Sequence, residues 1–433
     1  MLARLADSII EFGFRKFREL IALASATAVW VCAVWAGWVV RSVYPPTVVL
    51  LALPFLYVIN IAMFRAEERP LGWLAGSRLQ ELVRLGARLW VACCFTSLFA
   101  AAALVTVGVL WTLAHASLDT LVVQAGTTGT AVPPNATDPI DPLFRWIGTA
   151  CMTVAALALG YGYTVGQSRV GVTRLTLPVR HLPAGLDGLR IVQISDLHIG
   201  PYLGAERLAA YVARVNALDP DLTVITGDIV DQRVSDLDPA LPALSGLRAR
   251  YGVVAILGNH DHRAGADAIA ARIERGTEFS LLRDGRFTIC SSGGRLHIIG
   301  IEDRGSAVRS DACEKRRLRA LRSEIPGQEP VILLAHRPEL FKSAAAAGIA
   351  ITLSGHTHAG QIALNLGRGR TISLGCLMSR FTRGLFELGG SYLYVNRGLG
   401  VVAQPVRVGA PREIAVFELT RNAEAAAPFT AAA

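Results

Sequence analysis

Residues 189–200 read Leu-Arg-Ile-Val-Gln-Ile-Ser-Asp-Leu-His-Ile-Gly, and this stretch decides the fold expected for the C-terminal part of the chain. Its apolar run, rich in β-branched residues, predicts a buried strand, and Asp196 and His198 follow where the run ends. In α/β folds, ligands bind beyond the carboxyl ends of the strands, so both side chains fall where chemistry is expected. A carboxylate and an imidazole this close together can hold one metal ion, although such a pair is also common in ordinary loops.

Four further apolar runs end in the same kinds of residue. They lead into Gly227-Asp228-Ile229-Val230-Asp231, Gly258-Asn259-His260-Asp261, Ala335-His336-Arg337-Pro338 and Gly355-His356-Thr357-His358. Glycine before Asp228, Asn259 and His356 allows a sharp turn and keeps bulk away from a crowded centre. Oxygen and nitrogen donors without thiolates suit Mn²⁺, Fe²⁺ or Zn²⁺ and argue against a structural zinc site. Two such ions about 3.5–4 Å apart, sharing one carboxylate, can clamp both oxygens of a phosphoryl displacement.

The order D-x-H, G-D-x-x-D, G-N-H-D, H and G-H-x-H resembles the calcineurin-like metallophosphoesterase family. Within that family the chain looks most similar to membrane-associated bacterial phosphodiesterases with the G-D-x-x-D form. The resemblance covers roughly the C-terminal 240–260 residues, near the upper end of the usual size of one domain. It implies an α/β fold, a four-layer αββα sandwich, and a phosphodiesterase that acts on a phosphodiester or related phosphate ester by attack of a metal-bound hydroxide.

The same resemblance implies a role for each motif residue. The first metal ion would be held by Asp196, His198, Asp228 and His358, and the second by the bridging Asp228 with Asn259, His336 and His356. His260 would bind no metal and would protonate or stabilise the leaving oxygen, while Asp261 would fix the tautomer of its imidazole.

Several residues near the motifs keep two interpretations. Asp231 either belongs to the site or only hydrogen-bonds its loop, and Arg337 is either a phosphate contact or a surface charge. Arg397 and Arg407, on the tail loop that also resembles the family, are candidates to meet a phosphate. Ala359 stands where relatives often carry glycine, which puts the tight backbone geometry of that loop in question.

The composition places a membrane region ahead of this domain. Of 433 residues, 52% are hydrophobic and 18% charged, and the mean hydropathy is +0.41, so two or three structural units are expected. The apolar excess is concentrated in four runs, near residues 20–40, 47–64, 90–114 and 146–164, which are expected to span a membrane. The expected organisation is an amphipathic cytoplasmic segment (1–19), a transmembrane region (20–166), a metallophosphoesterase domain (170–420) and a disordered, Ala-rich tail (421–433).

Charge and cysteines indicate where the chain works. The net charge is +9, and its arginines crowd the flanks of the apolar runs, which by the positive-inside rule puts both termini in the cytoplasm. We therefore expect an integral protein of a bacterial inner membrane with a cytoplasmic catalytic domain, whose partners are membrane lipids and a phosphate-ester substrate. No recognition motif for nucleic acid accompanies the basic charge, and no nucleic-acid partner is expected. Seven cysteines without CxxC spacing fit a reducing compartment.

Beyond residue 169, short apolar runs alternate with helical patterns. Strands are expected at 222–226, 253–257, 296–301, 331–335, 349–353, 392–395 and 413–419, and helices near 204–217, 264–274 and 309–322.

Three other functions remain as alternatives. One is a hydrolase of a lipid-linked pyrophosphate, similar to UDP-2,3-diacylglucosamine pyrophosphatases, which the adjacent membrane makes attractive. A second is a non-catalytic membrane scaffold on the same fold, although such scaffolds tend to lose ligands that this chain keeps. A transporter is disfavoured because the apolar runs lack acidic residues.

Overall fold

The computed structural model describes residues 23–35, 52, 54, 56–63, 78–124, 142–304, 311–367, 370–377 and 379–422. The chain divides into two compact units, Met1–Gly160 and Tyr161–Ala433. The expected amphipathic segment 1–19 and nearly all of the expected tail 421–433 lie outside the described residues.

The first unit is helical in its described part. It contains Leu23–Trp35, a helical stretch at 56–63, α3 (Arg78–Gln124) and most of α4 (Pro142–Thr164). Between helices, the indole of Trp90 donates a hydrogen bond of 2.6 Å to the buried Asn60 side chain. Such a bond satisfies a polar side chain inside an apolar bundle.

Two helices in the described residues are long and apolar enough to cross a membrane. They are Leu85–Leu113, with a hydropathy of 2.2, and Pro142–Ser168, with 1.5. These correspond to the third and fourth expected spans, and α3 extends well beyond the expected 90–114 at both ends. Of the first two expected spans, the structure describes only Leu23–Trp35 and part of 52–63, so the count of four is not shown.

The second unit contains two six-stranded sheets and a small hairpin. The strands are β1 (Val170–Pro178), β2 (Arg190–Ile194), β3 (Leu222–Thr226), β4 (Val253–Ile256), β5 (Ser280–Leu281), β6 (Gly285–Ser291), β7 (Gly294–Ile301), β8 (Val331–Ala335), β9 (Ile351–Ser354), β10 (Ala363–Gly367), β11 (Arg370–Ser373), β12 (Gly384–Leu388), β13 (Ser391–Val395) and β14 (Arg412–Thr420). One sheet has the order β1-β14-β2-β3-β4-β5, the other β12-β13-β9-β8-β7-β6, and β10 pairs with β11.

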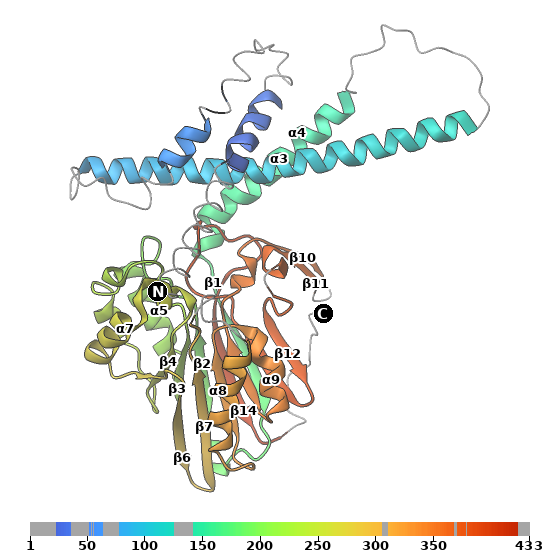
Figure 1. Cartoon of the computed structure of the whole chain (residues 1–433). Helices are drawn as coiled ribbons and strands as arrows, with labels where there is room; N and C mark the ends of the chain where they lie inside the picture. Colours follow the sequence, from blue (N-terminus) through green and yellow to red (C-terminus); the bar gives the residue numbers. More distant parts are fainter. Residues whose placement is uncertain are drawn as a thin grey trace. The chain divides into compact units, whose positions relative to one another are not determined.

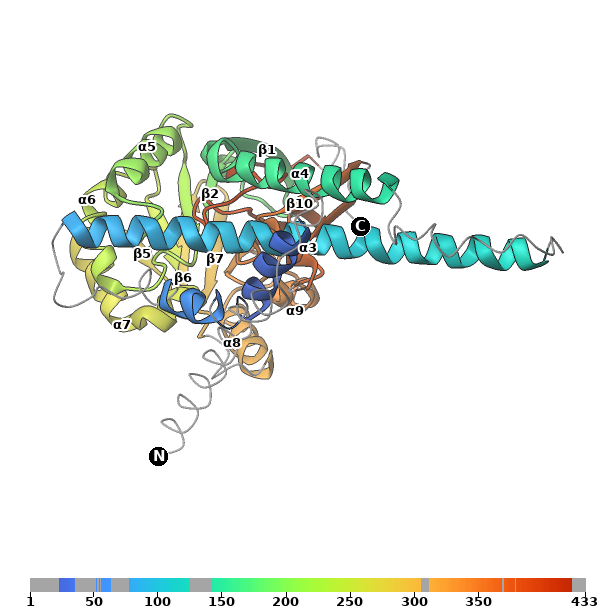
Figure 2. The same ribbon diagram turned by 90° about the horizontal axis from the view of Figure 1, so that it is seen from above.

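Helices cover the outer face of each sheet. They are α5 (Ala205–Asn216), α6 (Leu241–Leu244), α7 (Asn259–Gly276), α8 (Asp311–Ser323) and α9 (Phe341–Ala346). Helices α5 to α7 lie on one side of the paired sheets, and α8 and α9 on the other (Figures 1 and 2).

Three buried clusters correspond to three interfaces between layers. One packs α5 to α7 on the first sheet, one fills the space between the sheets, and one packs α8 and α9 on the second sheet. The expected αββα order of layers is therefore present, because each sheet buries both faces and each helix buries one.

The strand directions bring the polar motifs to one edge. Strands β2, β3 and β4 run parallel in the first sheet, and β7, β8, β9 and β13 run parallel in the second. Because parallel strands present their carboxyl ends at the same edge, the segments that follow β2, β3, β4, β8 and β9 converge there.

Candidate metal centre

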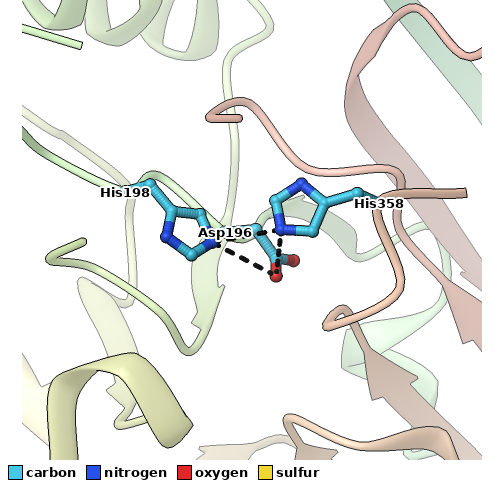
Figure 3. A group of neighbouring side chains, drawn as sticks. All are labelled: Asp196, His198 and His358. Carbon is cyan, nitrogen blue, oxygen red and sulfur yellow. Dashed lines mark hydrogen bonds and ion pairs between the residues drawn. The ribbon is translucent and has the colours of Figure 1, made fainter. Parts of the chain in front are cut away.

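The first group of side chains comes from the segments after β2 and β9. Asp196, His198 and His358 point toward one another (Figure 3). The Nε2 atom of His358 lies 3.3 Å from Asp196 Oδ1 and 3.1 Å from His198 Nε2. All three side chains are buried. One carboxylate oxygen and two imidazole nitrogens therefore converge on one point, which is the donor set expected for a divalent ion.

The second group comes from the segments after β3, β8 and β9. His336 Nε2 lies 3.2 Å from Asp228 Oδ2 and 3.3 Å from His356 Nδ1. The other ring nitrogen of His336 lies 2.8 Å from the carbonyl oxygen of Thr226, which as acceptor keeps the proton on Nδ1 and leaves Nε2 as the donor atom for a metal.

Asp228 joins the two groups. Its Oδ2 atom, which faces His336, also lies 3.6 Å from His198 Nε2 in the first group. Its Oδ1 atom accepts the backbone N–H of His260 at 2.8 Å, which fixes the rotation of the carboxylate. This placement between the groups is what a bridging ligand requires.

Asn259 supplies an independent sign that a cation belongs here. Its Oδ1 atom is buried and has no hydrogen-bond partner among the described residues. A buried amide oxygen without a donor is costly, and a metal ion would satisfy it. The residues present therefore fit divalent metal ions of the kind expected from the sequence.

The backbone of the site is strained where the side chains must turn inward. Asp196, His198, Asp228, His356 and His358 all have positive φ angles, between 46° and 72°. Non-glycine residues seldom adopt this conformation, and such strain gathers at functional sites. Ala359 shares it, with φ at 53°, and is fully buried, so its methyl group is tolerated in the tight turn.

The glycines before the ligands are required by close approach. A Cβ on Gly258 would lie 2.3 Å from Asp228 Oδ1, and one on Gly355 would lie 2.2 Å from Asp196 Oδ2. Any side chain at these positions would displace a carboxylate of the site. The expectation that these glycines keep bulk away from a crowded centre is confirmed.

Protonation in the site follows from burial and from the neighbouring charges. Burial disfavours the charged form of His336, but Asp228 and Asp196 outweigh it and raise its pKa to about 10. Burial also opposes ionisation of Asp228, yet the same imidazole holds the Asp228 pKa well below its usual range. Burial, with adjacent positive charge, lowers the pKa of His356 and His358, so both stay neutral and keep a lone pair for a metal.

His260 lies beside the first group without joining it. Its ring packs edge-on against His198, with ring centroids 4.6 Å apart. Its Nδ1 atom lies 2.9 Å from the carbonyl oxygen of Asp231 and 3.4 Å from the Asp231 carboxylate. Burial lowers its pKa, but the hydrogen bond to Asp231 and the charge of Asp228 raise it overall, which favours the imidazolium.

The role expected for Asp261 is wrong. Its carboxylate accepts the backbone N–H groups of Ile229, Val230 and Gly258, at 3.1, 2.8 and 2.9 Å, and so ties the loop after β3 to the start of α7. It is Asp231 that contacts the His260 imidazole, and Asp231 also lies 3.3 Å from His198 Nδ1. Asp231, left open from the sequence, is thus the side chain that orients two imidazoles of the site.

The candidate arginines all contact other residues of the chain. Arg337 donates from Nε to Asp303 at 2.6 Å and places Nη1 3.1 Å from His356 Nε2, so it borders the second group. Arg407 is buried and donates to the carbonyl oxygens of Arg397 and Gly400, while Arg397 pairs with Glu413 at 2.6 Å. A phosphate contact by Arg397 or Arg407 stays a prediction, with Arg407 buried beside His358, 3.4 Å from its Nδ1 atom, and Arg397 in an ion pair.

Comparison with known proteins agrees with this geometry. A family model described as calcineurin-like phosphoesterase matches residues 189–360. The uncharacterized metallophosphoesterase YkuE of Bacillus subtilis is 32% identical over 266 residues, which cover 60% of this chain and 90% of that protein. A transmembrane protein with metallophosphoesterase domain from Danio rerio is 32% identical over 289 residues, covering 63% of this chain and 62% of that protein.

A similar protein from Bos taurus, of the same description, is 31% identical and covers 56% of this chain and 55% of its own length. The chain thus spans little more than half of these two vertebrate relatives. Among solved structures, a dimetal phosphatase from Danio rerio is 12% identical with a TM-score of 0.36, covering 55% of this chain and 94% of that one. This structural similarity is too low to carry an argument. The match to YkuE over nearly its whole length, with the family model and the converging motifs, shows that the chain belongs to the calcineurin-like metallophosphoesterase family.

Proposed function

We propose that the chain is a membrane-anchored phosphoesterase with two divalent metal ions, and that it hydrolyses a phosphodiester or related phosphate ester. The observation that carries the proposal is Asp228 Oδ2, which lies within 3.2 Å of His336 Nε2 and 3.6 Å of His198 Nε2, between two ligand groups. Asp196, His198 and His358 would hold one ion, and Asn259, His336 and His356 the other. Bound there, the ions would offset charge on the phosphoryl oxygens and lower the pKa of a water molecule. The bound ions are proposed to be Mn²⁺, Fe²⁺ or Zn²⁺.

His260 is proposed as the proton donor to the leaving oxygen. The contact with Asp231 keeps a proton on Nδ1 and favours the imidazolium, so the ring can release a proton to an alkoxide leaving group. The packing against His198 holds the ring at the edge of the first group.

The test is hydrolysis by the full chain, purified in detergent micelles, with Mn²⁺ and bis-p-nitrophenyl phosphate as substrate. We expect turnover that chelation removes and Mn²⁺ restores, with less activity on p-nitrophenyl phosphate, a monoester. His260→Ala should keep the metal content and lose turnover of an alkyl diester, whose alkoxide leaving group needs a proton, whereas His181→Ala, which removes an exposed imidazole, should change neither. Metal-independent hydrolysis, or full activity of His260→Ala on the alkyl diester, would contradict the proposal. A folded protein that binds metal but hydrolyses no phosphate ester would favour the scaffold alternative.

A lipid-linked pyrophosphate is the second candidate substrate. The specific observation in its favour is that β10 follows the His358 turn along the chain and carries Leu364, which is 62% exposed. An apolar surface this near the site suits a substrate that carries acyl chains. Hydrolysis of UDP-2,3-diacylglucosamine in mixed micelles, compared with the soluble diester, distinguishes the two candidates.

The proposed location is a bacterial inner membrane with the second unit in the cytoplasm. Two apolar helices support membrane anchoring, and the arginine-rich flanks in the sequence support the orientation. Protease added to intact spheroplasts should leave the second unit uncut, and digestion from outside would reverse the orientation.

A further inference from the structure

The hairpin of β10 and β11 shows an inverted pattern of burial. Leu364 and Ile372 are register partners across the hairpin, and they are 62% and 61% exposed. The adjacent pair, Ala363 and Ser373, is buried. An antiparallel pair at a protein surface normally turns its apolar face to the core and its polar face to water. Here the large apolar side chains point away from the protein.

Polar contacts hold the hairpin in this orientation. Arg383 donates hydrogen bonds to the side chains of Asn365 and Thr371, the next register pair, and to the carbonyl oxygen of Gly409. Because the inward face is tied to the body of the unit through these bonds, Leu364 and Ile372 cannot turn inward without breaking them.

The hairpin and the last turn of α4 are both hydrogen-bonded to residues 404–408. The backbone N–H of Ala363 donates to Val408 at 2.8 Å, and the N–H of Arg407 donates to the carbonyl oxygen of Gly162 at 3.2 Å. The hydroxyl of Tyr163 also lies 3.3 Å from the Gln404 side chain. Residues 404–408 therefore separate the hairpin from the end of a helix, Pro142–Ser168, that is apolar and long enough to cross a membrane.

Few large apolar side chains of the second unit are exposed in its described residues. They are Tyr161 and Val165 at the end of the apolar helix, Leu364 and Ile372 on the hairpin, and Leu388 where β12 turns into β13. Arg169 places its guanidinium 5.8 Å from the centroid of the Tyr161 ring. Tyrosine and arginine at the end of an apolar helix are typical of the level of lipid headgroups.

We propose that the hairpin is a second membrane contact, in which Leu364 and Ile372 insert into the interface of the bilayer that α4 crosses. The occupant of this surface is lipid, since residues 404–408 bond the hairpin to the end of an apolar helix, where Tyr161 and Arg169 are residues typical of a headgroup boundary. The inference rests on the membrane anchoring in the proposed function and does not depend on hydrolysis. It places the turn that carries His358 next to the bilayer, where the phosphate of a lipid headgroup is within reach.

Photocrosslinking in vesicles tests the contact directly. Full chain with benzoylphenylalanine at position 364 or 372 would be reconstituted in vesicles of phosphatidylethanolamine and radiolabelled phosphatidylglycerol. The matched control is the same residue at position 388, which replaces a leucine 47% exposed on the same unit. Position 110 on α3, where the leucine is 61% exposed, tests whether the helix is embedded. We expect lipid adducts at 364, 372 and 110, at least about tenfold above those at 388.

Several results would overturn the contact. Lipid is excluded as the occupant if labelling at 388 equals that at 364 and 372. It is also excluded if positions 364 and 372 crosslink only to another copy of the chain, or form no adduct. Absence of adducts at 110 as well would reject membrane anchoring together with the hairpin contact. The phosphoesterase proposal fails separately if protein that gives the expected lipid adducts does not hydrolyse bis-p-nitrophenyl phosphate.

Discussion

Two clusters of buried or half-buried carboxylates in the second unit are neutralised in different ways. Around Glu302, Asp284 and Asp303, every carboxylate pairs with a guanidinium: Arg283 at 2.8 Å, Arg304 and Arg317 at 2.6 Å, and Arg337 at 2.6 Å. Around Asp196 and Asp228, the ion-pair partners in the described part of the chain are imidazoles. In the first cluster the carboxylates pair directly with permanent positive charge. In the second, Arg337 and Arg407 lie beside the imidazoles of His356 and His358, at 3.1 and 3.4 Å, and the ion pairs of Asp196 and Asp228 in the described residues are not with them.

The difference shows what the second cluster lacks. Burying carboxylates is costly unless a cation or hydrogen bonds compensate. At Asp228 the compensation comes from a proton on His336, whose pKa is raised to about 10. A metal ion binds the deprotonated form of such ligands and displaces that proton. The arginine cluster therefore needs no further cation, whereas the imidazole cluster, under the proposed function, exchanges a proton for metal ions.

The largest effect is expected for Asp228→Asn. Loss of the shared carboxylate should release metal and reduce diester hydrolysis by at least about 10⁴-fold, because the metals supply several kcal/mol of transition-state stabilisation. Metal content per chain and steady-state rates measure both. Near-normal metal content with near-normal rates would show that Asp228 does not bridge.

The next effect is expected for His260→Ala. Removal of the proton donor should lower kcat about 10³-fold while metal content stays unchanged. The loss should be smaller for a diester with a good leaving group, such as nitrophenolate, than for an alkyl diester, because a good leaving group needs no proton. Equal losses on both substrates would argue for a positioning role instead.

Asp231→Asn should have a smaller effect, about 10–100-fold on kcat. Burial opposes ionisation of Asp231, but His198 and His260 hold its pKa well below the usual range, so its charge is present throughout the working pH range. Without that charge the pKa of His260 falls, and since the ring acts as an acid, activity should decline at lower pH than in the wild type. An unchanged alkaline limb of the pH–rate profile would contradict this account.

Added metal should stabilise the folded chain through the cluster around Asp228 and not through the cluster around Glu302. With metal at about one hundred times its Kd, unfolding free energy should rise by about 2.7 kcal/mol in the wild type. Glu302→Gln should keep this gain and Asp228→Asn should lose it. Thermal unfolding with and without Mn²⁺ measures the gain, and equal gains in all three proteins would remove the distinction between the clusters.

The smallest effect is the pH dependence of the arginine cluster. Burial raises the pKa of Glu302, but His262 and Arg283 outweigh it and lower the pKa to about 2. A carboxylate with a lowered folded pKa contributes stability above its unfolded pKa, and that contribution disappears as the pH falls from about 4.5 toward about 2. Glu302→Gln should therefore cost about 1 kcal/mol at pH 7 and approach the wild type at low pH. A constant difference across that range would contradict the pairing.

Much of the fold follows from apolar periodicity. The expected strands 222–226 and 331–335 match β3 and β8 at both ends, because fully buried parallel strands read as continuous apolar runs. Strands β6, β11 and β12 are not predicted from the sequence, since these strands contain exposed or half-buried positions and no continuous buried apolar run. Helix α7 begins at Asn259 and not near 264, because its first turn lies inside the motif and its backbone breaks at Gly265.

The sequence predicts the arrangement of the site less completely than it predicts the strands that hold it. The motifs identify residues that share a sheet edge, and the structure does bring together Asp196, His198, Asp228, His336, His356 and His358. They cannot say which of two carboxylates reaches the His260 ring. Asp261 is the nearer in sequence, but the first turn of α7 directs it back to the loop after β3. Asp231 reaches the ring from that loop, so proximity in sequence was misleading.

Electron paramagnetic resonance of the Mn²⁺-loaded full chain tests whether Asp228 bridges two metal ions, as proposed. We expect two Mn²⁺ per chain with the multiline spectrum of an exchange-coupled pair, and an uncoupled spectrum or no bound Mn²⁺ in Asp228→Asn. A single uncoupled Mn²⁺ per wild-type chain at saturation would contradict this bridging role.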